Sequence, residues 1–200
     1  MFSSADKENI KPTKHQSAWL KRAMTYFLPL ILVLLAATWT RADPVASGIF
    51  ELINQRLAYM QYVALSKAST HSPIANYDRE LKVLKKAKTE AKQLGLNAES
   101  LSFFVQAQMD VAKAIQYRYL ADWQVDKPSH LTAMDLDLKI RPELLKIDKE
   151  ILTKLKSYLD SGQTIDGHLQ HEFFKAINIE HITDKDKAIL FNSLEKVRLR

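Results

Sequence analysis

From Asp43 to the C-terminus, apolar residues recur three and four positions apart, which is the spacing of one face of an α-helix. No window alternates strictly between apolar and polar residues, as a half-buried strand does. Residues that interrupt helices, such as Pro73, Gly95 and Gly162, separate the periodic segments. The pattern therefore predicts an all-α fold of about six helices, over residues 45–70, 76–95, 98–123, 136–160, 165–177 and 183–197.

The segment before Asp43 has the pattern of an export signal. Residues 1–22 are polar and basic, and residues 23–39 carry no charge. Their strongly apolar part is shorter than the ~20 residues that a membrane-spanning helix needs, and Thr40 and Ala42 place small residues at −3 and −1 of a cleavage site. We predict a signal peptide over residues 1–42 and a mature chain that is periplasmic or secreted. The alternative is an uncleaved anchor, which also delivers the folded part across a membrane.

A linker near residues 124–134 divides the exported part, because Lys127-Pro128-Ser129 breaks the helical pattern. We expect a three-helix unit over residues 43–124 that carries the functional site. A C-terminal helical portion over residues 125–200 is expected to pack on this unit, as a lobe of the same domain or as a separate one.

The amino-acid composition limits the classes of ligand, fold and catalytic group that the chain can have. With 29 Lys and Arg against 23 Asp and Glu, the formal net charge is +6, so the surface attracts anions. This sign does not select among small anions, acidic lipid and nucleic acid. Four Gly and six Pro are too few for the turns of a β-sandwich or barrel. The absence of Cys excludes disulfides, a thiol nucleophile and thiolate metal ligands.

Charged and polar residues fall on the apolar faces of three successive predicted helices. Arg56 and Lys67 are eleven residues apart, so they point within roughly 20° of each other on one helix. Glu80 lies at the centre of the apolar arc of the next helix, and Arg79 lies at its edge. Gln116 is central on the third. Each helix therefore turns a polar group inward.

Such inward cations need partners, because an unpaired buried charge costs several kcal/mol. Arg56, Lys67 and Arg79 outnumber Glu80, the one clearly inward acid. The excess predicts a cationic pocket for a small molecule with two carboxylates. The alternatives are a buried salt-bridge network, or side chains whose stems are covered while their charges reach water.

The spacing of these residues resembles that of the all-helical chorismate mutases, and more narrowly that of their exported, periplasmic gamma subclass. The matching features are Arg56, Lys67 and Arg79-Glu80 at this spacing, Pro73-Ile74 in the loop, and the segments 114–117 and 121–123. The match covers about residues 45–123 and extends weakly to Ile140-Arg141-Pro142.

The resemblance implies a role for each candidate residue. Arg56 and Arg79 would bind the substrate carboxylates, with Arg141 as a further substrate-binding cation. Lys67 and Gln116 would donate hydrogen bonds to the ether oxygen as the catalytic pair.

The resemblance also implies that Glu80 accepts a hydrogen bond from the ring hydroxyl, and that backbone groups of residues 76–78 approach the ligand. The pocket would belong to the three-helix unit of one chain within a homodimer. The substrate would be chorismate, with no cofactor, metal, nucleic acid or, after signal cleavage, membrane. Two departures affect the pocket wall: Ala112 stands where relatives often have a small hydroxyl residue, and Lys113 where some exported members carry an acid.

Two other hypotheses for the function are kept beside the chorismate mutase. An isochorismate pyruvate lyase has a related fold and a similar cationic pocket, and a noncatalytic exported helical module could use the same charges for a partner protein. His168 and His171 lie three residues apart, but no third ligand accompanies them, so we expect no metal site. The lysines of residues 82–92 are interrupted by Glu90 and predict a solvated face rather than a phosphate site.

Overall fold

Seven α-helices and two short helical turns build the part of the chain that the computed structural model describes, residues 43–126 and 131–200. The predicted signal segment lies outside these residues. The elements are α2 (Pro44–Ala58), α3 (Met60–Ser69), α4 (Tyr77–Leu94), α5 (Ala98–Asp122), the π turn η1 (Leu136–Ile140), α6 (Arg141–Asp160), the 3₁₀ turn η2 (Gly167–Leu169), α7 (Gln170–Ala176) and α8 (Asp184–Leu194). The predicted all-α fold is confirmed.

The ends of α4 and α5 are set by capping residues that are visible in the sequence. The Asn76 side chain accepts a hydrogen bond from the Arg79 amide and caps α4, and the Asn97 side chain caps α5 in the same way. Gly95 ends α4 with a φ of 74°, a left-handed conformation that glycine adopts without a Cβ penalty. The predicted bounds of these two helices therefore agree with the structure to within a residue.

Two predicted helices are interrupted. The predicted helix 45–70 breaks at Tyr59, where ψ is −14° instead of the helical value near −42°, so it forms α2 and α3. The predicted helix 136–160 begins with the π turn, in which the Ile140 amide reaches back five residues to the Asp135 carbonyl at 3.3 Å. Pro142 explains the irregular start, because it has no N–H to donate to the preceding turn.

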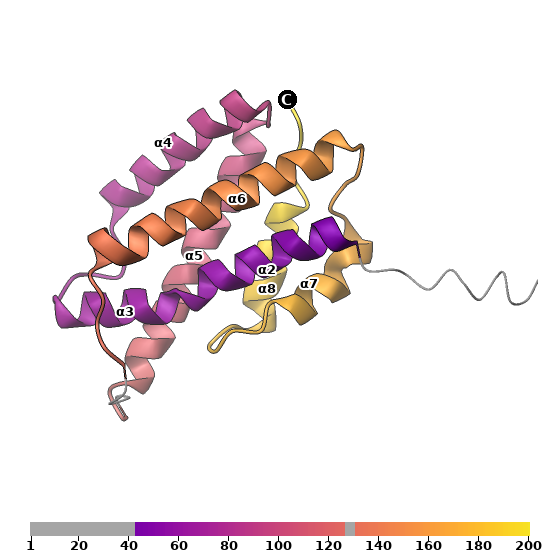
Figure 1. Cartoon of the computed structure of the whole chain (residues 1–200). Coiled ribbons are helices and arrows are strands. Elements are labelled where there is room, and N and C mark those ends of the chain that lie inside the picture. Colours follow the sequence, from indigo (N-terminus) through magenta and orange to yellow (C-terminus); the bar gives the residue numbers. More distant parts are fainter. Residues whose placement is uncertain (1–42, 127–130) are drawn as a thin grey trace, which may run out of the picture. The chain divides into compact units, whose positions relative to one another are not determined.

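The helix α5 is central, and it packs against α3, α4 and α8 (Figure 1). The helix α2 lies beside α6 and also contacts α7. Phe173 on α7 joins the two groups, since its ring centroid lies 5.1 Å from that of Phe50 and 5.4 Å from that of Phe191. Buried residues of all the α-helices except α4 form most of this shared core, to which α4 adds Ala91.

The helices α2 to α5 and the C-terminal portion lie in one compact unit, described over residues 43–126 and 131–200. The chain end returns to the turn between α4 and α5, where the Arg200 amide donates to the Gly95 carbonyl at 2.9 Å. No helix within the described ranges is long and apolar enough to cross a membrane.

Candidate active site

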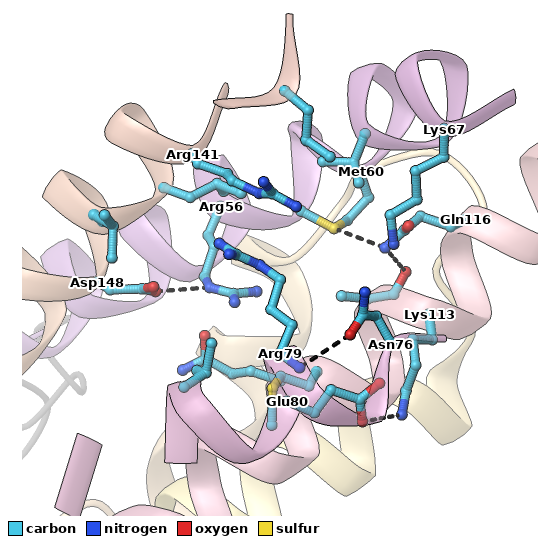
Figure 2. Close-up of a pocket in the computed structure, with 18 of the residues that line it drawn as sticks. Arg56, Met60, Lys67, Asn76, Arg79, Glu80, Lys113, Gln116, Arg141 and Asp148 are labelled. Carbon is cyan, nitrogen blue, oxygen red and sulfur yellow. Dashed lines mark hydrogen bonds and ion pairs between the residues drawn. The ribbon is translucent and has the colours of Figure 1, made fainter. Parts of the chain in front are cut away.

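A cavity of about 730 Å³ opens between α2, α3, α4, α5 and α6. The six residues singled out from the sequence all line it: Arg56, Lys67, Arg79, Glu80, Gln116 and Arg141. Seven Lys and Arg residues and five Asp and Glu residues line the wall, so its formal charge is positive by two. Figure 2 shows the three labelled arginines and Lys67 pointing toward a common space.

Arg56 is the most deeply buried of these cations, with 8% of its surface exposed. Its Nε donates a hydrogen bond to Asp148 Oδ1 on α6, at 2.7 Å (Figure 2). Its Nη1 is buried and has no hydrogen-bond partner among the described residues. One edge of the guanidinium is therefore held by the protein, while the other has donors to offer.

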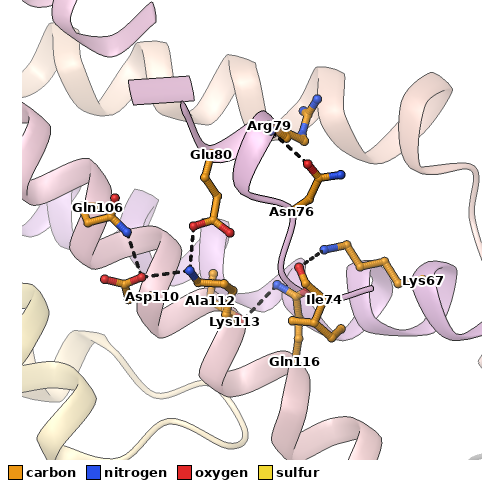
Figure 3. A network of polar contacts seen from close by, with 10 residues as sticks. All are labelled: Lys67, Ile74, Asn76, Arg79, Glu80, Gln106, Asp110, Ala112, Lys113 and Gln116. Carbon is orange, nitrogen blue, oxygen red and sulfur yellow. Dashed lines mark hydrogen bonds and ion pairs between the residues drawn. The ribbon is translucent and has the colours of Figure 1, made fainter. Parts of the chain in front are cut away.

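Lys67 extends from α3 into the cavity, where its Nζ donates to the Ile74 carbonyl oxygen at 2.6 Å (Figure 3). Burial, followed by the nearby charges of Arg141 and Arg79, lowers the pKa of Lys67 from 10.5 to about 8. Glu80 acts in the opposite direction but is outweighed. A cation that the protein stabilises this poorly is suited to an anionic ligand, whose charge would raise the pKa again.

Glu80 is held by Lys113, whose Nζ lies 2.7 Å from Glu80 Oε2 and 3.1 Å from Asp110 Oδ1. Gln106 donates to Asp110 in turn, so a chain of polar contacts runs along α5 to the cavity (Figure 3). Burial lowers the pKa of Lys113, but its hydrogen bonds to the two acids outweigh this effect and raise it. The carboxylate that faces the cavity is thus anchored from the neighbouring helix.

Arg79 is the least enclosed cation of the six residues, and it makes no ion pair with any described residue. It follows the capping Asn76, whose side-chain oxygen accepts from the Arg79 amide at 3.0 Å. Arg141 stands at the start of α6 and is paired with Asp137, four residues earlier. Two further cations are therefore presented from different helix starts.

Gln116 is 4% exposed on α5. Its Nε2 donates to the Ala112 carbonyl at 3.0 Å and approaches Met60 Sδ at 3.4 Å, while its Oε1 is buried without a partner in the described chain. A thioether is a weak acceptor, so a ligand oxygen that replaced it would gain the second N–H. Gln116 keeps one amide hydrogen available in this way.

Two residues of this wall were not expected from the sequence in the roles they take. Asp148, the partner of Arg56, was not singled out, and its only signal is that it lies seven residues after Arg141 and so on the same face of α6. Lys113 was noted as a departure, not as the anchor of Glu80. The cavity also draws part of its wall from α6 and the residues before it, outside the three-helix unit expected to form it.

Comparisons with known proteins agree on one family. The family model described as Chorismate mutase type II matches residues 41–117. The protein named Secreted chorismate mutase from Yersinia pestis is 34% identical over 149 residues, which span 74% of this chain and 80% of that relative. This chain belongs to the chorismate mutase family. The protein named Monofunctional chorismate mutase from Enterobacter agglomerans is likewise 34% identical over 147 residues, or 73% of this chain and 80% of the relative.

The fold of this chorismate mutase agrees with a solved structure. The crystal structure of the secreted chorismate mutase from Yersinia pestis has a TM-score of 0.71 to this chain, with 34% identity, and the match covers 76% of this chain and 97% of that one. The helical chorismate mutase fold expected from the spacing of Arg56, Lys67 and Arg79 is therefore confirmed. The assignment of individual residues to substrate groups stays a prediction.

Proposed function

We propose that this cavity binds chorismate and rearranges it to prephenate, with the residues that line the cavity acting directly on the substrate. The observation that carries the proposal is the excess of two positive charges around a cavity whose deepest cation, Arg56, has a buried Nη1 with no partner among the described residues. Chorismate carries two carboxylates, so its charge balances this excess. Charge-assisted hydrogen bonds from arginines to carboxylates are among the strongest polar contacts in proteins.

The reaction is pericyclic, since one C–O bond breaks while one C–C bond forms, and it needs no nucleophile or proton transfer. Catalysis then consists of holding the substrate in its folded shape and stabilising the charge that develops on the ether oxygen. Both tasks suit a rigid wall of fixed cations and donors.

Lys67 and Gln116 are the proposed donors to the ether oxygen. The Ile74 carbonyl holds the Lys67 ammonium through one of its three donors, and the other two can turn to a ligand. Gln116 supplies a neutral N–H that is independent of pH. Because both side chains are already positioned before the substrate arrives, little reorganisation is needed at the moment of reaction.

Arg56 and Arg79 are proposed to bind the two substrate carboxylates, with Arg141 at the start of α6 as a third cation. Glu80 is proposed to accept a hydrogen bond from the ring hydroxyl through the oxygen that Lys113 leaves free, since Lys113 occupies Oε2. Three cations and one acceptor thus fix the ring from several sides.

We further propose that the mature protein is exported and forms a homodimer. Export is supported by the signal pattern of residues 1–42 and by the relative that is named a secreted chorismate mutase. The dimer is an expectation from the resemblance, which sedimentation of the purified protein would test.

The activity is tested by incubating purified residues 43–200, and the full chain beside it, with chorismate. We expect loss of chorismate with stoichiometric appearance of prephenate and no requirement for an added metal. A parallel incubation with isochorismate, analysed for pyruvate, separates a mutase from an isochorismate pyruvate lyase. A protein that neither turns over chorismate nor binds a bicyclic mimic of the transition state would instead be a binding module.

A further inference from the structure

Asp148 places a negative charge on the wall of a cavity that is otherwise suited to a dianion. Its side chain is 36% exposed, and it lies on α6 opposite Arg56 on α2. A carboxylate at this position repels an anionic ligand unless a neighbouring cation neutralises its charge. Asp148 Oδ1 accepts a hydrogen bond from Arg56 Nε at 2.7 Å, so the carboxylate is paired with the Arg56 guanidinium.

The geometry of the guanidinium decides what this contact does. An arginine presents five N–H donors in a rigid planar fork. With Nε engaged by Asp148, the edge formed by the two terminal nitrogens remains, and Nη1 on that edge is buried and unpaired within the described chain. A buried donor without a partner is costly, so this edge is prepared for a ligand oxygen.

The register of α6 places two cavity-lining residues of opposite charge on one face. Arg141 and Asp148 are seven residues apart, so they point within about 20° of each other. One helix therefore supplies a cation directly and fixes a second cation on α2 through an acid. The arrangement ties the orientation of Arg56 to the packing of α2 against α6.

We infer that Asp148 is a positioning residue, which holds Arg56 so that its terminal guanidinium edge faces a substrate carboxylate. This inference rests on the proposed function, and it deepens it by adding a residue of α6 that does not touch the substrate itself. Without Asp148 the guanidinium can rotate about its side-chain bonds, and the substrate must then order it during binding.

The test compares four variants with the parental protein: Asp148→Ala, Asp148→Asn, Arg56→Ala, and the double variant Asp148→Ala with Arg56→Ala. For each, kcat and KM are measured with chorismate, and the Kd of a bicyclic dicarboxylate mimic of the transition state is measured separately. Thermal unfolding by circular dichroism shows whether each variant is folded. The matched control is Asp160→Ala, which removes an acid paired with Lys156 on the same helix but outside the cavity.

We expect Asp148→Ala to lower kcat/KM by roughly 10- to 100-fold and to weaken the mimic by a similar factor, as for loss of a charge-assisted contact. Asp148→Asn keeps an oxygen that accepts from Nε, so it should stay within roughly threefold of the parent. The double variant should be no worse than Arg56→Ala, because Asp148 acts only through Arg56. Asp160→Ala should keep the parental kcat/KM.

Two results would overturn the inference: parental kcat/KM and mimic affinity in folded Asp148→Ala, or a double variant whose loss equals the product of the two single losses. If the parental protein does not turn over chorismate at all, the proposed function fails. The Kd of the mimic then still decides about Asp148, since weaker binding in Asp148→Ala with recovery in Asp148→Asn supports its role, and equal binding contradicts it.

Discussion

Lys67 on α3 donates a hydrogen bond from its ammonium to the carbonyl oxygen of Ile74, 2.6 Å away across the turn that leads into α4. One of the three ammonium donors is thereby used to orient the group, and two are left. Burial and the charges of Arg141 and Arg79 lower the pKa of Lys67 to about 8. This contact therefore holds a destabilised cation in place beside the substrate cavity.

Replacing Lys67 by Ala should lower kcat on the order of 100-fold or more, because it removes a fixed donor from the oxygen on which charge develops. Steady-state kinetics with chorismate measures the effect. Lys146→Ala is the control, since Lys146 is an exposed cation of α6 that does not line the cavity. A Lys67→Ala protein as fast as its parent would remove Lys67 from the mechanism.

The pH dependence of kcat/KM should report Lys67 in the free enzyme. With its pKa near 8, Lys67 is charged at neutral pH and loses its proton as pH rises, so kcat/KM should be level around pH 7 and fall above about pH 8. The bound dianion raises the pKa of Lys67, so kcat should stay level to higher pH than kcat/KM.

Lys67→Arg provides the comparison, because a guanidinium stays charged throughout this range. Its kcat/KM should be lower than that of the parent owing to the different shape, but it should not fall between pH 8 and 10. If the variant and the parent lose activity together over that interval, a group other than Lys67 is titrating.

Gln116→Glu should make activity depend on pH in a new way. The amide of Gln116 donates at any pH, whereas a carboxyl group donates only while it is protonated. We therefore expect the activity of the variant to decline as pH rises from about 5 to 8, in a range where the parent is level. A pH–rate profile of both proteins, measured at saturating chorismate, checks this, and a level profile in the variant would contradict the role of Gln116.

Much of the fold could be predicted because helix periodicity and capping are local. The bounds of α4 and α5 follow from Asn76, Gly95 and Asn97, each of which acts within a few residues of its own position. The break at Tyr59 could not be predicted in this way, since apolar spacing continues across it and only the backbone angle changes. Periodicity identifies a helix but averages over one irregular residue.

The site was predictable where its residues share a helix face, and less so where two helices meet. Arg56 and Lys67 were found because the predicted helix 45–70 places both on one apolar stripe, and after the break at Tyr59 they still line the same cavity from α2 and α3. Asp148 was missed, although it lies on the same face of α6 as Arg141, because a helical wheel does not reveal which helix that face meets. The pairing of Arg56 with Asp148 depends on the packing of α2 against α6.

Asp186 should carry a large share of the attachment of α8 to α5. It is 5% exposed, accepts from Arg118 Nη1 at 2.5 Å, and closes a capping box with Thr183. Burial alone raises the pKa of Asp186, but the hydrogen bonds from Arg118 and Thr183 outweigh it and lower the pKa. The stability that this depressed pKa provides is therefore present above the ordinary Asp range and is lost as pH falls through the folded value.

We expect Asp186→Ala to reduce the free energy of unfolding by about 2–4 kcal/mol, because it leaves a partly buried guanidinium without its acidic partner. Thr183→Ala, which removes the cap and the hydroxyl bond to Asp186 but keeps the Arg118 ion pair, should cost about 1 kcal/mol. Urea unfolding at pH 7 measures both, and the difference between Asp186→Ala and the parent should shrink below about pH 4. Equal losses in the two variants would show that the cap, not the ion pair, is what matters.

Lys113→Ala should impair substrate binding even though Lys113 is not itself a proposed substrate ligand. Removing it leaves the half-buried Glu80 carboxylate without its 2.7 Å partner, and an uncompensated acid in the wall opposes a dianion. We expect kcat/KM to fall by roughly tenfold, mainly through KM. In the double variant Lys113→Ala with Glu80→Gln, KM should return close to the parental value, because the unpaired charge is gone. The control is Lys92→Ala, on the same helix as Glu80 but away from the cavity, and it should keep the parental kcat/KM. If Glu80→Gln brings no recovery in KM, Lys113 acts on the substrate directly and not by neutralising Glu80.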